Sequence, residues 1–342
     1  MKSEVIAKLA GVSRSTVSRV INNYPDISQE TREKVLKIIK ENNYYPNLSA
    51  QKLAGKNTGI IGLLIYTGKI IESGSYKRVS DSLYYSELVS KIIDASEKLG
   101  YSVLTSYINK KNNNWKKIFG NGLIDGAIVI SGGKKSKEIE ELIRSKNKVV
   151  LLDYEKYISN KTTSTVNPDN YQGGYKATEF LISNGHEKIL HLMGDLKRKM
   201  SIKRARGYLD CLKKYGIKES KIISGEFTEK SGYKIIEEYI KENKSFDYTA
   251  IFAGNDYVAV GAMKALKKYN IRVPEDVSII GFDNMLLGEY TFPTITSVNH
   301  LDKQIAEKSL KKLVKLIDGE EGTEETTNVE IVERESVYNL KK

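Results

Sequence analysis

Apolar residues recur three or four positions apart in three short segments at the start of the chain, which is the spacing of one face of a helix. The apolar positions of these segments are Val5, Ile6 and Leu9; Val12, Val17, Val20 and Ile21; and Val35, Leu36, Ile38 and Ile39. Ser3, Ser13 and Ser28 precede them as candidate N-caps, and Gly11 permits a tight turn between the first two segments. The pattern predicts three helices within residues 1–47.

The outer face of the second predicted helix is polar and carries Arg14, Ser15, Thr16, Ser18 and Arg19. Two helices joined by a three-residue turn and followed by a third form a helix-turn-helix pattern, whose second helix fits the major groove of DNA. Arginine can read guanine with two hydrogen bonds, and hydroxyl groups suit phosphates. On pattern alone, the alternative is a solvated pair of amphipathic helices.

After about residue 58, short apolar runs alternate with longer amphipathic segments. The runs are 59–66, 101–106, 126–131, 149–153, 188–194, 249–254 and 277–283. Strands that alternate with helices predict parallel sheets in doubly wound α/β layers. Ligands of such folds bind beyond the carboxyl ends of the strands. Asp153, Asn255 and Asp283 stand at strand ends and are therefore candidate ligand-binding residues.

The chain has 342 residues and a formal net charge of +12, and residues 1–58 carry ten basic and five acidic side chains. This concentration of positive charge suits a polyanionic partner. The single cysteine, Cys211, excludes an internal disulfide and fits a reducing compartment. No apolar run approaches the ~18 residues of a membrane span, and the N-terminus has no apolar signal segment. We expect a cytoplasmic protein that does not enter the membrane.

The sequence offers little catalytic chemistry. His186, His191 and His300 lack metal-ligand spacing, and one cysteine cannot build a thiolate zinc cluster. The phosphate-binding patterns GxGxxG and GxxxxGK[ST] do not occur, nor does the nucleophile pattern GxSxG. We expect a protein that is not an enzyme and that needs no metal and no cofactor.

Three segments resemble the LacI/GalR family of bacterial repressors: AKLAGVSRSTVSRVINN at 7–23, SQETREKVLKIIKENNYYPN at 28–47 and SAQKLAGKNTGIIGLLI at 49–65. The family usually has Asp where this chain has Val5. The resemblance implies that Arg14, Ser15 and Arg19 read bases and that Thr16 and Ser18 contact phosphate, with Asn22 also at the DNA. It further implies a hinge helix in residues 48–57, whose Leu53 wedges into the minor groove at the centre of the operator.

The resemblance continues through DNYQGGYKATEFLISNGHEKI, RARGYLDCL, TAIFAGNDYVAVGAMKALKKYNIRVPEDVSIIGFDN and PTITSVNH. It implies a two-lobed fold of the periplasmic-binding-protein type over residues 58–342, with three crossovers and an effector between the lobes. The lobes would be 58–166 with 299–326, and 167–298 with 327–340. Family correspondence adds to the effector contacts Tyr84, Tyr85, Arg198, Arg204, Phe227 and His300.

Some of these assignments have alternatives. Asp283 and Arg204 would otherwise form a structural ion pair between the lobes, and Tyr84 would otherwise pack in the core. Residues 68–81 form an insertion where the family commonly has a shorter turn, and its role is open. Aspartate, asparagine and arginine suit the vicinal hydroxyls of a sugar, while an aromatic face covers its C–H groups.

The sequence therefore predicts a homodimeric repressor that binds near-palindromic double-stranded operator DNA under the control of a small molecule, with a sugar as the favoured effector. Its divisions would be a helix-turn-helix domain at 1–47, a hinge at 48–57 and an effector-binding and dimerisation module at 58–342. The alternatives are a regulator corepressed by a purine or nucleoside, and a solute-binding receptor on the same fold.

Overall fold

The computed structural model describes residues 3–44, 57–67, 82–133, 136–154, 158, 160–300 and 303–341. The chain divides into two compact units, residues 1–59 with 120–123, and residues 60–119 with 124–342. Leu53, most of the predicted hinge and the 68–81 insertion lie outside the described residues. Within the described ranges, every helix is too short or too polar to cross a lipid bilayer.

The N-terminal part of the first unit, residues 3–44, is a bundle of three helices that we call the headpiece. Its helices are α1 (Ser3–Ala10), α2 (Arg14–Ile21) and α3 (Gln29–Glu41). The Oγ of Ser13 accepts a hydrogen bond from the Thr16 amide at 3.0 Å, and the Oγ of Ser28 accepts one from the Thr31 amide at 3.3 Å. Two of the three predicted N-caps, Ser13 and Ser28, are thus confirmed, because each satisfies a backbone donor that the helix cannot.

The headpiece core differs in part from the prediction. Its buried residues are Ile6, Ala7, Ala10, Val17, Val20, Val35 and Tyr44. Val5, Leu9 and Leu36 were expected inside but are exposed, and Ser3 is the first helical residue of α1 rather than its cap. The prediction underrated the two alanines of α1, whose small side chains let that helix approach its neighbours closely.

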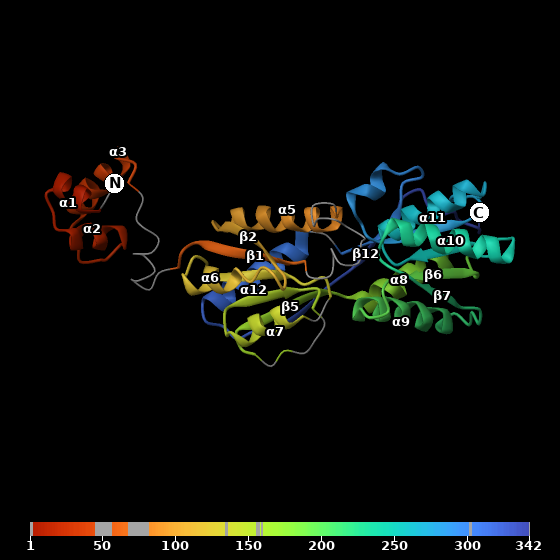
Figure 1. Cartoon of the computed structure of the whole chain (residues 1–342). Coiled ribbons are helices and arrows are strands. Elements are labelled where there is room, and N and C mark those ends of the chain that lie inside the picture. Colours follow the sequence, from red (N-terminus) through yellow and green to blue (C-terminus); the bar gives the residue numbers. More distant parts are fainter. Residues whose placement is uncertain are drawn as a thin grey trace. The chain divides into compact units, whose positions relative to one another are not determined.

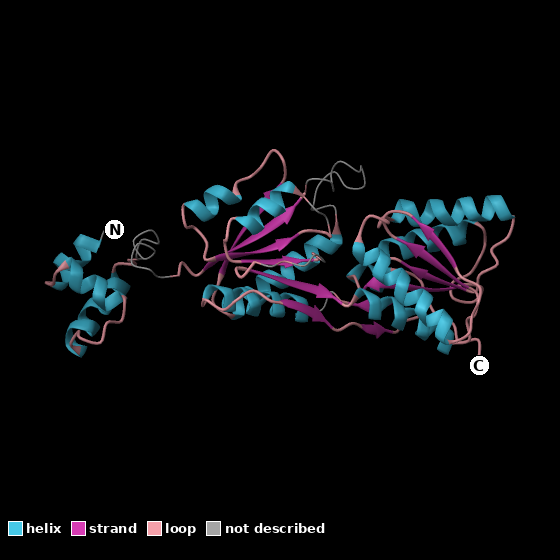
Figure 2. Ribbon diagram, turned by 90° about the horizontal axis from the view of Figure 1, so that it is seen from below, coloured by secondary structure: helices cyan, strands magenta, loops and turns pink. Residues whose placement is uncertain are grey.

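The second unit contains two six-stranded sheets with helices on both faces of each (Figures 1 and 2). The first sheet has the order β11-β5-β4-β3-β1-β2 and is entirely parallel. Its strands are β1 (Ile60–Tyr66), β2 (Ser102–Ile108), β3 (Gly126–Ile130), β4 (Val149–Leu152), β5 (Thr163–Pro168) and β11 (Glu324–Thr327). Helices α5 (Leu83–Lys98) and α12 (Lys303–Ile317) cover one face, and α6 (Trp115–Gly120) and α7 (Lys137–Arg144) cover the other.

The second sheet has the order β12-β10-β9-β8-β6-β7, with only β12 antiparallel. Its strands are β6 (Ile189–Met193), β7 (Lys221–Ser224), β8 (Ala250–Ala253), β9 (Ser278–Asp283), β10 (Thr296–Asn299) and β12 (Glu330–Val332). One face packs on α8 (Asn170–Ser183) and α9 (Lys199–Lys214), and the other on α10 (Glu229–Asn243) and α11 (Asp256–Lys268). A 3-10 helix, η2 (Leu286–Tyr290), follows β9.

The predicted α/β fold with doubly wound parallel sheets is confirmed. All seven predicted apolar runs contain a strand, and five further strands, β5, β7, β10, β11 and β12, were not predicted. The chain passes between the sheets after β5, after β10 and between β11 and β12. We call the two halves of this unit the first lobe and the second lobe, after the sheets they contain.

Candidate functional site

The headpiece presents two arginines on the outer side of α2. The Nη1 of Arg14 lies 3.3 Å from the Oε1 of Glu4, and the guanidinium of Arg19 is paired with the carboxylate of Asp26. All four side chains are well exposed, so these ion pairs contribute little to stability and can exchange for contacts with DNA.

Short hydrogen bonds order the hydroxyl groups of the same helix. Ser13 Oγ lies 2.6 Å from Ser15 Oγ and 2.8 Å from Thr16 Oγ1, and Asn22 Nδ2 donates to Ser18 Oγ at 3.2 Å. The predicted DNA-binding residues of the headpiece thus all lie on α2 or at its C-cap. Hydroxyls whose positions are fixed in this way suit contacts to phosphate oxygens.

In the second unit, two carboxylates lie at strand ends in an unusual backbone conformation. Asp153 follows β4 with φ 55°, and Asp283 ends β9 with φ 108°. Both residues are buried. Positive φ values are uncommon for residues other than glycine, and such conformations concentrate at functional sites. The backbone conformation therefore marks the two aspartates that were predicted to bind a ligand because they stand at strand ends.

Asp153 is held by Tyr84, whose hydroxyl donates to its Oδ2 at 2.7 Å. Burial raises the pKa of Asp153, and burial together with the Asp153 charge raises the pKa of Tyr84 well above its ordinary value. Tyr84 consequently stays a neutral donor. Its ring also packs against the core of the first lobe. Tyr84 therefore both contacts a predicted site residue and contributes to core packing.

Arg204 is anchored on three sides. Its Nε donates to Asn170 Oδ1 at 2.9 Å and its Nη1 donates to the Gly254 carbonyl at 2.6 Å. Its Cζ lies 3.4 Å from the centroid of the Phe282 ring, and its Nη2 lies 3.8 Å from Asp283 Oδ1. Arg204 on α9 and Asp283 on β9 both belong to the second lobe, so the ion pair that the alternative expected is present within this lobe rather than between the lobes.

His300 completes this polar network. Its Nε2 donates to Asp283 Oδ1 at 2.9 Å, while its buried Nδ1 has no hydrogen-bond partner among the residues that the structure describes. The ring lies between those of Tyr84 and Phe282, with centroids 6.0 and 5.5 Å away. Nδ1 is thus the ring nitrogen of His300 that remains for a hydrogen bond with a ligand hydroxyl.

The remaining predicted residues of the second lobe border this network. Asn255 is the N-cap of α11, its Oδ1 accepting from the Val258 amide at 3.0 Å, so its Nδ2 is the group left for a ligand. Phe227 lies against Gly194, where an added Cβ would come within 2.3 Å of the ring. Arg198 and Arg204 place their Cζ atoms 5.3 and 5.6 Å from the Phe227 centroid.

Tyr85 reaches the same region from α5. A Cβ built on Gly132, just after β3, would lie 2.6 Å from the Tyr85 hydroxyl, and one on Gly133 would lie 3.0 Å from Met200 Cε of the second lobe. Burial raises the pKa of Tyr85 to about 12. The glycines let the first lobe's loop approach these side chains closely.

We call the nine predicted effector residues the interlobe cluster. They are Tyr84, Tyr85, Asp153, Arg198, Arg204, Phe227, Asn255, Asp283 and His300. Arg204 stands in the second turn of α9, and the other eight come from strand ends, helix starts or the loops between them, at the carboxyl edges of the two sheets. Their buried carboxylates, guanidinium and imidazole can together bind a polyhydroxylated molecule.

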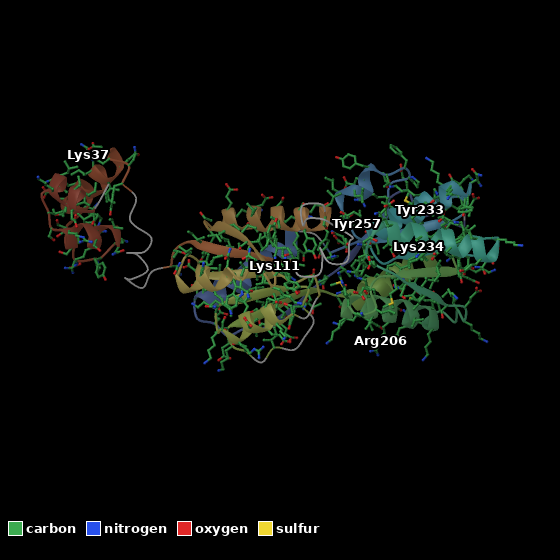
Figure 3. The ribbon with its side chains drawn as sticks, in the orientation of Figure 1. Lys37, Lys111, Arg206, Tyr233, Lys234 and Tyr257 are labelled. Carbon is green, nitrogen blue, oxygen red and sulfur yellow. The ribbon has the colours of Figure 1, made fainter. Side chains whose placement is uncertain are left out.

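Sequence reasoning missed the residues that tie the two lobes together beside this cluster. The Leu83 amide donates to the hydroxyl of Tyr257, labelled in Figure 3, at 2.7 Å, and the Leu286 amide donates to Glu87 Oε1 at 3.0 Å. Each bond joins α5 of the first lobe to the second lobe. Nothing in the local sequence marks Tyr257 or Glu87, because each partner is more than 170 residues away.

Asp256 was also missed, although it follows Asn255 directly. Its Oδ1 accepts from Ser297 Oγ at 2.6 Å and its Oδ2 accepts from the Met285 amide at 2.7 Å. Burial, and then the charge of Asp283, raise the pKa of Asp256 to about 8. Asp256 therefore supports the turn after β9, which carries Asp283, and the strand-end rule could have indicated it.

A separate hollow of about 370 Å³ lies beside the crossovers of the second unit. It is lined by Tyr154, Asn167, Pro168, Asp169, Tyr171, Lys203, Arg206, Glu324, Glu325 and Thr326. None of these belongs to the interlobe cluster. Its walls carry charges of both signs, and we refer to it as the crossover hollow.

Comparisons with known proteins agree with this arrangement. Residues 4–47 match the sequence profile of bacterial regulatory proteins of the lacI family, and residues 178–337 match that of a periplasmic binding protein-like domain. The HTH-type transcriptional regulator MalR of Clostridium butyricum is 36% identical over 354 residues, which cover 99% of this chain and all of MalR.

Two solved structures are similar over nearly the whole chain. The transcriptional regulator CelR in complex with cellobiose has a TM-score of 0.69 and 26% identity, covering 98% of this chain and 99% of its own. The lac repressor dimer bound to operator and the anti-inducer ONPF has a TM-score of 0.77 and 25% identity, covering 97% and 98%.

Proposed function

Because this chain belongs to the lacI family of bacterial regulatory proteins and is a DNA-binding transcriptional repressor controlled by a small molecule, we propose that a carbohydrate bound at the interlobe cluster is the controlling effector. The protein is a regulator rather than an enzyme, as are the relatives it resembles. Because its target is bacterial DNA, we also propose that it acts in the cytoplasm.

The observation that carries this proposal is the buried network of Arg204, Asp283 and His300. A carboxylate accepts hydrogen bonds from neighbouring hydroxyls, a guanidinium donates to their oxygens, and the open imidazole nitrogen accepts one more. Phe227 adds an aromatic face for C–H groups. The structure of CelR with cellobiose supports the choice of a sugar.

DNA would be bound by a helix-turn-helix domain at residues 1–47, which contains the headpiece. Arg14, Ser15 and Arg19 would contact base edges, while the other polar residues of α2 hold phosphates. Residues 48–57 would form the hinge, and Leu53 would wedge into the centre of the operator. The two lobes, with boundaries near residues 166, 298 and 326, would form the effector module.

A homodimer is the proposed assembly, because a near-palindromic operator presents one half-site to each of two headpieces. The lac repressor structure, a dimer on its operator, supports this proposal.

Control of DNA binding would pass through the relative arrangement of the lobes. An effector that contacts both lobes would change how they are arranged. It would thereby weaken or strengthen the hydrogen bonds that join them, such as Leu83 to Tyr257 and Leu286 to Glu87. A shift of α5 would then change how the two hinges pair. Coupling of this kind is reciprocal and typically amounts to about 1–3 kcal/mol.

Fluorescence anisotropy with DNA from upstream of the chain's own gene tests this function, at fixed salt and with a panel of sugars and purines. Specific binding that one sugar weakens would support a sugar-induced repressor. Tightening by a purine would replace the sugar with a corepressor. Absence of any effect of sugar on binding would refute the carbohydrate assignment.

A further inference from the structure

The N-cap residue of α9 and two residues of its first two turns form a row of side chains along the buried side of the helix. Arg198, Ser201 and Arg204 follow each other at intervals of three residues, which places them on one face of the helix. The Phe227 ring lies within 5.6 Å of both guanidinium carbons, at the two ends of the row. Arg204 already donates hydrogen bonds to Asn170 and Gly254. The polar groups of Arg198 and Ser201 lie nearer the helix N-terminus.

Ser201 is 1% exposed, yet its Oγ has no hydrogen-bond partner in the described part of the chain. Buried hydroxyls within other helices donate to the carbonyl four residues earlier, as Ser96 does to Ile92 at 2.6 Å and Thr178 to Gly174 at 2.8 Å. Ser201 cannot repeat this bond inside α9, because Lys197 precedes the helix. Its hydroxyl lies in the first turn and leans toward the helix start, since side chains tilt toward the N-terminus.

Arg198 is the N-cap residue of the same helix, and its buried Nε also has no hydrogen-bond partner among the described residues. The nearest carboxylate oxygen is Oδ2 of Asp195, 3.9 Å away and beyond hydrogen-bond distance. A Cβ on Gly133 would lie 4.0 Å from Arg198 Cδ, so the side chain faces the end of β3 in the first lobe.

The charge around this position favours an anion. The positive end of the 16-residue helix α9 lies here, where the first backbone N–H groups have no partner within the helix. Lys197 and Lys199 flank Arg198, and Asp195 is the acidic neighbour within 4 Å of it. Unsatisfied buried donors at a helix N-terminus are the arrangement that binds phosphate and carboxylate groups.

We propose that the effector carries an anionic group, a phosphate or a carboxylate attached to the sugar, and that Arg198, Ser201 and the N-terminus of α9 bind it. The sugar hydroxyls would occupy the Arg204, Asp283 and His300 network at the other end of the row. This proposal rests on the proposed function and narrows its ligand class from sugars in general to acidic sugars.

Isothermal titration calorimetry on the full chain tests the proposal. The probes are common hexoses and disaccharides, each as the neutral sugar, its 6-phosphate and its uronate, with inorganic phosphate alone and hypoxanthine as further ligands. We expect one acidic sugar to bind at least tenfold more tightly than its neutral parent, which corresponds to about 1.4 kcal/mol. The phosphate and uronate arms identify which anion the site takes.

Three variants locate the preference. Arg198→Gln should reduce binding of the acidic sugar far more than binding of its neutral parent, and so should abolish the tenfold difference. Ser201→Ala should reduce binding of the acidic sugar while leaving the neutral parent within about twofold. Arg206→Gln is the matched control, because Arg206 is exposed on the same helix (Figure 3). Its side chain lines the crossover hollow instead of the interlobe cluster. It should leave the preference unchanged.

Several outcomes would overturn the proposal. Equal affinity for neutral and acidic sugars, tight binding of hypoxanthine alone, or equal loss of both sugar forms in Arg198→Gln would each refute it, and loss of the preference in Arg206→Gln would move the anion to the crossover hollow. Operator release is measured in parallel. Release by a neutral sugar keeps the proposed function and rejects the acidic ligand, whereas no response to any sugar rejects the proposed function itself.

Discussion

Replacing Asp283 with asparagine removes the negative charge that Arg204 and His300 both face, with almost no change in side-chain volume. Asp283 is buried, accepts a hydrogen bond from His300 at 2.9 Å and lies 3.8 Å from a nitrogen of Arg204. Alanine is the poorer choice, because stripping a buried arginine of its carboxylate costs about 3–5 kcal/mol of folding stability. Asparagine keeps an oxygen that can face His300.

The expected loss follows from the change in hydrogen-bond strength. Hydrogen bonds to charged groups contribute about 1.5–3 kcal/mol and those between neutral groups about 1 kcal/mol. Each effector hydroxyl bound at this carboxylate should therefore lose about 0.5–2 kcal/mol, which weakens effector binding roughly 2- to 30-fold per hydroxyl. Operator affinity without effector should not change.

The assay is anisotropy of labelled operator DNA, titrated first with protein and then with effector at constant salt. Asp276→Asn is the matched control, since Asp276 is paired with Arg272 on the surface and contacts no residue of the interlobe cluster in the described structure. A folded Asp283→Asn protein whose effector midpoint lies within twofold of the parent would show that Asp283 does not contact the ligand.

Three further predictions concern other parts of the chain. Leu53→Ala should weaken operator binding at least tenfold more than binding to random DNA, because only a kinked operator uses the wedge; competition titrations measure this ratio. Arg14→Ala should relax base preference at one position of each half-site by about 1–3 kcal/mol, which selection from a randomised operator measures. Burial lowers the pKa of His191 to about 4, whereas an unfolded histidine titrates near 6.5. The unfolded state thus binds the proton first, so acid should remove up to about 3 kcal/mol of stability as the pH falls from about 6.5 toward 4, as urea unfolding can measure.

Each of these has its own control. Equal losses on operator and random DNA in Leu53→Ala would remove the wedge from the mechanism. An unchanged selection profile in Arg14→Ala would leave base reading to Ser15 and Arg19. His191→Phe cannot titrate and should lose less stability on acidification than the parent; parallel losses would assign the acid sensitivity to other groups.

The sequence predicted those strands in which nearly every residue is buried. Strands buried on both faces, such as β3 and β9, read as uninterrupted apolar runs because helices cover each side. β7 and β11 are short, partly exposed strands, KIIS and EETT, which carry no such signal. β5 reads TSTVNP, and its buried hydroxyls are determined by the lobe packed around it rather than by local hydrophobicity.

Topology alone decides where three of the predicted site residues lie. Asp153, Asn255 and Asp283 follow strands of parallel sheets, and parallel strands bring their carboxyl ends to one edge. The bond between Asn170 and Arg204 has no such rule, because it depends on how α8 and α9 cross. That crossing is close enough for a Cβ on Gly174 to fall 2.1 Å from the Arg204 carbonyl oxygen, a fact that only the packed structure contains.

The three crossovers also set the order in which the chain can fold during synthesis. β11 at residues 324–327 completes the edge of the first sheet, and β12 at residues 330–332 pairs with β10 to complete the second. The core of the headpiece is finished by Tyr44, when roughly 300 residues are still to be made. A chain that ends before β11 would therefore contain the complete core of the headpiece, but each of its two sheets would lack an edge strand.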